Sequence, residues 1–198
     1  LTPNDACQSR NRSYANHTMN IWTEKFVLPQ STIDKWKKRY SDDFFLTIKP
    51  DDRGSHYTGY HRNPNNGQHV DLSKGSYVDK DLLSTYVPKL KEVLGKFGLS
   101  GLFSYQSIWG QYYKKDIGGV ISPHHHFVEP KNMLSWIHFL DVPDQKCFYF
   151  LVGDEKIYPE SQNQFNLMFY PSFAVHGVDK LLHAKDRLVI VGNISKLL

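Results

Sequence analysis

The sequence has few cysteines, no long apolar run and no leader pattern. Its 198 residues include two cysteines, Cys7 and Cys147, which are too few for the disulfide framework of a small secreted domain. We do not expect these two cysteines to pair. No stretch approaches the ~18 apolar residues that a membrane-spanning helix requires. The first residues show no signal-peptide pattern, which predicts a cytoplasmic protein with no membrane partner.

The sequence also lacks a strong excess of charge of either sign. The formal net charge of +4 comes from 24 basic and 20 acidic residues that are scattered along the chain. This excess is too small to support a nucleic-acid-binding surface. Hydrophobic residues make up 40% and charged residues 22%, as in ordinary globular proteins. Aromatic residues reach 14%, mainly Tyr and Phe, and this enrichment favours β-strands.

The composition changes along the chain and predicts an arm followed by one domain. Residues 1–19 are polar and unpatterned, so we expect an N-terminal arm. Residues 20–198 are expected to form a single domain, which is an ordinary size for one. Within it, residues 20–102 mix helical and strand patterns and are expected to support a β-rich core over residues 103–198.

Two helices are expected in the N-terminal part. Ser31 is a candidate N-cap for a helix over about 31–41, whose packed face would contain Ile33, Trp36 and Tyr40. Apolar residues at helical spacing predict a second helix over 79–97. Pro88 would kink that helix or begin another, and Gly98 would end it. The other expected elements are strands over 21–28 and 44–48 and a long loop over 51–77.

Strand patterns follow one another after residue 101, and no helix is expected beyond Phe97. Several short strands separated by Gly, Pro, Asp and Asn are typical of an antiparallel sandwich or barrel. The fold class is therefore mainly β with N-terminal helices. The expected strands are 103–113, 120–128, 133–142, 147–152, 165–169, 174–178 and 188–194.

Three histidines suggest a metal site. His124 and His126 stand at positions i and i+2, which a strand directs to the same face. His125 between them should point the other way. His176 follows 50 residues after His126 inside an apolar segment. Because imidazole is the commonest side-chain ligand of transition metals, the pattern predicts a site for Fe, Zn, Cu or Ni.

The C-terminal half resembles the 2-oxoglutarate- and Fe(II)-dependent oxygenases, including phage and bacterial members related to prolyl hydroxylases. The resemblance covers about residues 103–195. It is carried by the histidine pair, by the stretches Ser135–Leu140 and Phe169–Val178, and by Arg187 eleven residues after His176. It implies a double-stranded β-helix, a jelly-roll that cupins share. It also implies a dioxygenase that decarboxylates 2-oxoglutarate to succinate while it hydroxylates a small-molecule or peptidyl substrate with dioxygen.

The resemblance also implies roles for individual residues. His124, His126 and His176 would hold Fe(II) and form the catalytic centre. Arg187 would bind the distal carboxylate of the co-substrate, for which a guanidinium is well shaped. The further candidate contacts to the co-substrate are Tyr113 and Asn193. The alternatives are a surface ion pair of Arg187 with Asp179 or Asp186, a core role for Tyr113, and a strand-end role for Asn193.

The sequence departs from the common pattern of that family at the second ligand. His126 stands where a carboxylate is commoner, so the predicted site is all-nitrogen unless Glu129 joins it. Val189 replaces a small hydroxyl residue two positions after the arginine. A second H-x-D pattern, His69–Asp71, falls in the loop-rich segment and is not favoured as a ligand pair.

Two other functions stay open at this point. An all-imidazole site also suits a cupin-like metalloprotein with three histidines, such as another dioxygenase, an isomerase or a zinc hydrolase. The glutamate and glycines expected of cupin motifs are missing, which counts against this reading. The third interpretation is a non-enzymatic jelly-roll binding module whose histidines are structural.

Overall fold

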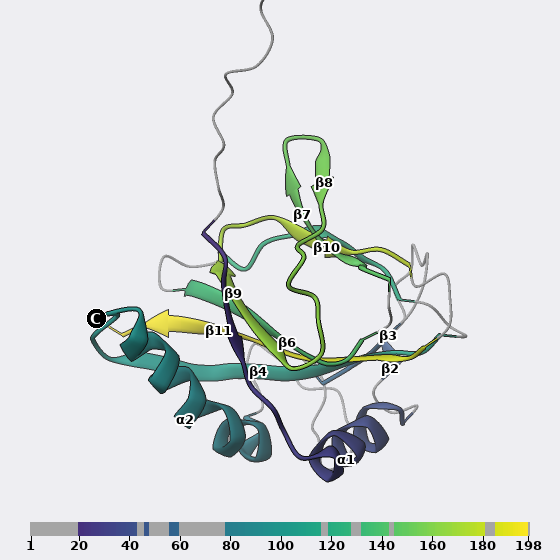
Figure 1. Ribbon diagram of the computed structural model, residues 1–198, viewed down its shortest axis with the longest axis horizontal. Coiled ribbons are helices and arrows are strands. Elements are labelled where there is room, and N and C mark those ends of the chain that lie inside the picture. The colour runs from purple at the N-terminus through teal and green to yellow at the C-terminus, as the bar shows by residue number, and fades with distance from the viewer. Residues whose placement is uncertain are drawn as a thin grey trace, which may run out of the picture.

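Two antiparallel β-sheets face each other, and two helices cover the outer face of the larger sheet (Figure 1). This computed structural model describes residues 20–42, 46–47, 56–59, 78–115, 119–127, 132–142, 145–180 and 185–197. The described residues are mostly β, as predicted. The predicted arm over residues 1–19 lies outside them, and so do Cys7, Glu129 and His69–Asp71. Neither described helix is long and apolar enough to cross a membrane.

The strands divide between a seven-stranded and a four-stranded sheet. The large sheet has the order β1-β9-β6-β11-β4-β3-β2, and the small sheet has the order β5-β10-β7-β8. From β4 onward, four strands belong to each sheet. The elements are β1 Trp22–Lys25, α1 Gln30–Tyr40, β2 Leu46–Thr47, β3 His56–Thr58, α2 Lys80–Lys96, β4 Phe103–Tyr113, β5 Ile121–His124, β6 Asn132–Asp141, β7 Phe148–Val152, β8 Glu155–Ile157, β9 Asn166–Pro171, β10 His176–Val178 and β11 Arg187–Lys196.

Most expected elements are confirmed, and three details of the prediction are wrong. Helix α1 begins before Ser31, because the fixed φ of Pro29 starts the helix and its carbonyl already accepts from the Ile33 N–H. Of the two alternatives expected at Pro88, a second helix does not form, because Pro88 lies inside one continuous helix α2. Strand β3 occupies part of the segment expected to be loop. Strand β8 was also not expected, since it is short and fully exposed and so carries no apolar alternation.

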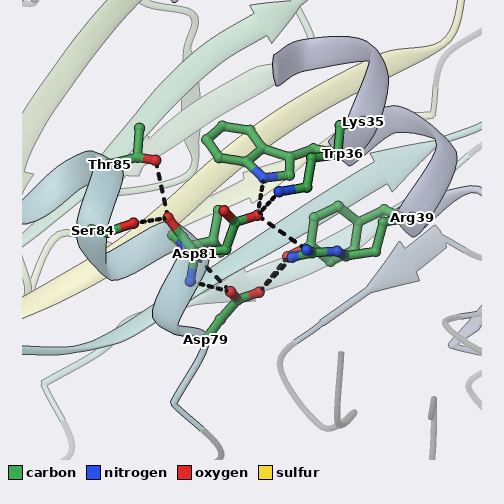
Figure 2. Close-up of polar contacts among 9 residues, drawn as sticks. Lys35, Trp36, Arg39, Asp79, Asp81, Ser84 and Thr85 are labelled. Atoms are coloured by element: carbon green, nitrogen blue, oxygen red, sulfur yellow. Dashed lines mark hydrogen bonds and ion pairs between the residues drawn. The ribbon is translucent and has the colours of Figure 1, made fainter. Parts of the chain in front are cut away.

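The two faces of the large sheet carry separate cores. On the outer face, the predicted α1 residues Ile33, Trp36 and Tyr40 are buried with one side of α2. A polar joint ties the two helices together (Figure 2): Arg39 donates to Asp79 and Asp81, and Asp81 also accepts from Lys35 and the Trp36 indole. Asp79 further caps α2 through the Asp81 and Leu82 N–H groups.

The inner face of the large sheet fills the space between the sheets. Strands β4 and β11 are antiparallel neighbours, with Val191 opposite Trp109, Val189 opposite Gln111 and Arg187 opposite Tyr113. These six residues share one face, because strand side chains alternate. Four of them belong to the buried cluster between the sheets: Trp109, Tyr113, Val189 and Val191.

Candidate metal centre

The three histidines predicted as ligands lie together between the small sheet and the large one. His124 ends β5 and His176 begins β10, and the two residues are direct partners in the small sheet. His126 lies two residues beyond the end of β5, in a bend. Each imidazole offers one nitrogen, and these nitrogens all lie within 4.8 Å of one another. His125 is exposed, which agrees with the expected alternation.

Hydrogen bonds fix the orientation of two of these rings. Nδ1 of His124 lies 2.9 Å from the Ser122 carbonyl, and Nδ1 of His176 lies 2.9 Å from the Ala174 carbonyl. A carbonyl can only accept, so both rings carry their proton on Nδ1. The ligand atom of each ring is then Nε2. This pairing of a ligand nitrogen with a bonded N–H is usual at metal sites.

Burial keeps the imidazoles neutral. It lowers the pKa of His126 to about 4 and that of His176 to about 3, and the neighbouring His124 ring lowers both pKa values further. Aromatic rings supply much of this apolar surrounding, including Phe148 at 5.5 Å and Tyr170 at 5.1 Å from the His176 ring, between centroids. Neutral imidazole is the form that binds a metal.

A cavity opens beside the three rings. It is open to solvent, and its empty space of about 410 Å³ includes part of that solvent region. The described residues that line it include no carboxylate. They are Trp109, Gln111, Ile121, His124, His126, Trp136, Ile137, Phe148, Tyr170, His176, Val178, Val191 and Gly192.

Arg187 is a buried cation, and its side chain is 1% exposed. Its Nη1 and Nη2 atoms have no hydrogen-bond partner among the described residues. The guanidinium carbon lies 4.8 Å from the Tyr113 ring centroid and 5.8 Å from that of Phe139. The alternative of a surface ion pair is therefore wrong. Asp179 and Asp186 have other partners: Lys156 for Asp179, and the Tyr112 hydroxyl and the Lys115 N–H for Asp186.

Tyr113 connects Arg187 to the wall of the cavity. Tyr113 is fully buried, and its hydroxyl donates to Gln111 Oε1 at 2.9 Å. Burial raises the Tyr113 pKa, so the phenol keeps its proton. Gln111 lines the cavity, and the sequence analysis did not name it. Its position two residues before Tyr113 on a predicted strand was the signal that could have found it.

Asn193 lies on the inner face but not among the described residues that line the cavity. It is buried, and its side-chain carbonyl accepts from the Ser135 hydroxyl at 2.8 Å. Its role as a contact to a co-substrate stays a prediction.

Comparison with known proteins shows which solved structures have a similar fold. No family model matches the sequence, and no curated protein matches it. Among solved structures, a Pseudomonas putida prolyl-4-hydroxylase is 14% identical with a TM-score of 0.60, covering 91% of this chain and 94% of its own. The viral collagen prolyl hydroxylase of Paramecium bursaria Chlorella virus-1, as its 2-oxoglutarate complex, is 10% identical with a TM-score of 0.57, covering 89% and 96%.

The chain has the fold of the 2-oxoglutarate/Fe(II)-dependent oxygenases. A third similar structure is the epimerase SnoN in complex with Fe³⁺, α-ketoglutarate and nogalamycin RO, with 14% identity and a TM-score of 0.60 over 90% of this chain and 79% of that one. Hydroxylases and an epimerase therefore share the fold, so the fold alone does not fix the reaction.

Proposed function

We propose that this chain is an Fe(II)- and 2-oxoglutarate-dependent dioxygenase that hydroxylates a small-molecule or peptidyl substrate and converts 2-oxoglutarate to succinate. One observation carries the proposal. A buried guanidinium whose terminal nitrogens have no partner in the described part of the chain shares the inner face of the large sheet with residues that line the three-histidine cavity. The four-and-four division of strands β4 to β11 supports its assignment as a double-stranded β-helix.

The donor set suits a first-row transition metal. Three neutral imidazoles favour Fe, Zn, Cu or Ni over Mg or Ca, which prefer oxygen ligands. His124, His126 and His176 would hold Fe(II). When bound, iron supplies the redox chemistry that couples decarboxylation of the co-substrate to oxidation of a substrate C–H bond.

Arg187 supplies the contact that a dicarboxylate needs. Val191 lines the cavity and lies four residues after Arg187 on the same face of β11. Four residues of a strand separate the two positions by ~13 Å. A bound dicarboxylate and the long Arg187 side chain would together cover this span. A buried guanidinium without a partner is unfavourable, whereas a guanidinium that holds a carboxylate through two parallel hydrogen bonds is stabilised.

The surrounding residues exclude water from this path. Phe139, Phe148 and Val189 are buried in the cluster between the sheets, next to Tyr113. Their apolar side chains lower the local dielectric constant and strengthen an ion pair between Arg187 and a carboxylate. Tyr113 and Gln111 would complete the polar wall on the β4 side.

An anaerobic titration tests the proposal. Fe(II) and 2-oxoglutarate added together should produce the weak visible charge-transfer band of the iron chelate, and neither should produce it alone. Arg187→Met should require far more 2-oxoglutarate for the same band. Arg39→Met is the matched control, since Arg39 belongs to the polar joint between the helices, and it should titrate as the wild type does. A wild type without the band would contradict the proposal.

The all-imidazole donor set favours one second candidate, a three-histidine zinc hydrolase or another cupin-like enzyme. Such an enzyme has no use for a carboxylate partner of Arg187. Tight Zn(II) binding with no effect of 2-oxoglutarate on the metal spectrum would favour this candidate. Failure to bind any metal would instead favour the non-enzymatic binding module.

A further inference from the structure

We infer that Ser172 is a positioning residue, and that the buried chain Asn193–Ser135–Ser172 couples the large sheet to two of the three metal ligands. The inference rests on the metal site of the proposed function. It begins from His126, which is the ligand that no strand holds. His124 and His176 are fixed by pairing of β5 with β10, but His126 lies beyond the end of β5.

The turn between β9 and β10 supports that ligand. The His126 N–H donates to the Ser172 carbonyl at 2.9 Å. Two residues later, the Ala174 carbonyl accepts from Nδ1 of His176 at 2.9 Å. The turn is closed by a hydrogen bond of 2.9 Å from the Ala174 N–H to the Pro171 carbonyl. One short segment therefore holds the backbone of one ligand and the ring of another.

The side chain of Ser172 anchors this turn to the large sheet. Its Oγ lies 3.1 Å from Ser135 Oγ on β6, and Ser135 Oγ lies 2.8 Å from Asn193 Oδ1 on β11. The Asn193 carbonyl can only accept, and Ser135 has a single proton, so Ser135 donates to Asn193 and Ser172 donates to Ser135. All three side chains are buried, with Ser172 at 0% exposure.

The burial of this chain gives it rigidity. A network of buried polar side chains is rigid when every member has a hydrogen-bond partner. Here the hydrogen bonds connect Asn193 on β11, Ser135 on β6 and Ser172 in the turn without a gap. The Ser172 N–H also donates to the Met133 carbonyl at 3.3 Å, which adds a second tie to β6. Loss of the Ser172 hydroxyl would leave the Ser135 oxygen without its donor and loosen the turn that sets His126. Partners outside the first ligand shell commonly change metal affinity 10- to 100-fold.

Metal affinity and ligand geometry test the inference without any catalytic assay. Ser172→Ala should weaken Zn(II) binding about 10-fold in chelator competition and should change the visible absorption of the Co(II)-loaded protein. Ser172→Cys keeps the shape but bonds weakly, so it should change both readouts in the same direction. The control is Ser161→Ala, because the Ser161 hydroxyl bonds Met168 Sδ at 3.2 Å and none of the three histidines. It should leave both readouts unchanged.

The outcomes separate this inference from the proposed function. Wild-type Zn(II) affinity and an unchanged Co(II) spectrum in folded Ser172→Ala would overturn the positioning role and leave the oxygenase proposal intact. If Ser172→Ala does not fold, Ser135→Ala interrupts the same chain and is judged by the same two readouts. A wild type that binds neither metal would overturn both proposals.

Discussion

The helix-covered side of the large sheet and the space between the two sheets differ in how their histidines and arginines are bonded. On the helix-covered face, His138 is bonded at both nitrogens, with Nδ1 2.7 Å from the Tyr86 hydroxyl and Nε2 2.8 Å from the Phe26 carbonyl. Arg39 on that side holds two carboxylates (Figure 2). Between the sheets, three imidazoles converge from the small sheet and the segment after β5, and the terminal nitrogens of Arg187 on the large sheet have no partner among the described residues. Hydrogen-bonded groups contribute to the stability of the fold, whereas a buried cation without a partner favours binding of an anion.

Replacing one histidine on each side of the large sheet gives the largest expected contrast in metal affinity. His176→Ala removes a proposed ligand and should weaken Fe(II) or Zn(II) binding by more than the roughly 100-fold that outer-shell changes reach. His138→Phe should leave metal affinity unchanged. It should instead lower the free energy of unfolding by ~3 kcal/mol, because the Tyr86 hydroxyl and the Phe26 carbonyl lose their partner in the core. Chelator competition and urea unfolding measure the two effects.

Equal loss of metal affinity in the two variants would remove the distinction between the two sides of the large sheet. Full metal affinity in His176→Ala would show that His176 is not a ligand.

The two arginines give the next contrast. Arg187→Met should weaken 2-oxoglutarate binding roughly 100-fold, the loss expected for a charge-assisted bidentate contact. The same variant should raise the free energy of unfolding of the ligand-free protein by ~1–4 kcal/mol, because it replaces an unpaired buried charge by an apolar side chain. Arg39→Met should lower that free energy by ~1–3 kcal/mol, since it leaves Asp79 without its Arg39 partner and removes one of the two cations that bond Asp81. Calorimetric ligand titration and urea unfolding measure these changes.

A destabilised Arg187→Met with wild-type ligand affinity would identify Arg187 as a structural residue. In that case the apparent lack of partners would have no bearing on binding.

The buried histidine of the helix face also predicts a pH dependence. Burial lowers the His138 pKa from 6.5 to about 3, so the unfolded chain takes up a proton below pH 6.5 that the folded protein refuses. Stability from the neutral ring is complete above pH 6.5 and is lost as the pH falls toward 3. The stability advantage of wild type over His138→Phe should therefore shrink by about 1.4 kcal/mol per pH unit below 6.5.

Urea unfolding of the metal-free proteins between pH 7.5 and 5 provides the measurement. A constant difference across this range would mean that folding does not change the His138 pKa.

The smallest expected contrast is the effect on the free energy of unfolding of substitutions at the N-termini of α1 and α2. Asp79→Ala should lower the free energy of unfolding by ~1–2 kcal/mol, because Asp79 caps α2 and also accepts from Arg39. Ser31→Ala should change it by less than ~0.5 kcal/mol, since α1 has no side-chain cap. Thermal unfolding of the two variants compares them directly. A larger loss in Ser31→Ala than in Asp79→Ala would mean that α1 is capped by Ser31 after all.

The sequence predicted those parts of the molecule that depend on local periodicity. The alternation of β4 from Phe103 to Tyr113 is a property of a strand and could be read without a structure. The i, i+2 spacing of His124 and His126 predicted that the two rings lie together, but the strand expected to carry both, over 120–128, ends at His124. The start of α1 could not, because Ser31 and Pro29 both suit a helix N-terminus and the tertiary setting decides between them.

The supporting contacts of the site were beyond prediction. The His126 N–H donates to the Ser172 carbonyl, 46 positions away, and the Ser172 hydroxyl bonds Ser135 on a neighbouring strand. Such pairings depend on register and sheet order, which single-sequence patterns do not encode. His138 illustrates the same limit, since its two partners are Tyr86 on α2 and Phe26, the residue after β1.

The proposed function requires that one dicarboxylate binds both Arg187 and the metal site. The most direct measurement compares binding of 2-oxoglutarate and 2-oxobutyrate, which lacks the distal carboxylate, to Zn(II)-loaded wild type and Arg187→Met. Wild type should prefer 2-oxoglutarate by roughly 100-fold, and Arg187→Met should bind both compounds about equally. An undiminished preference in Arg187→Met, or no preference in the wild type, would contradict the account.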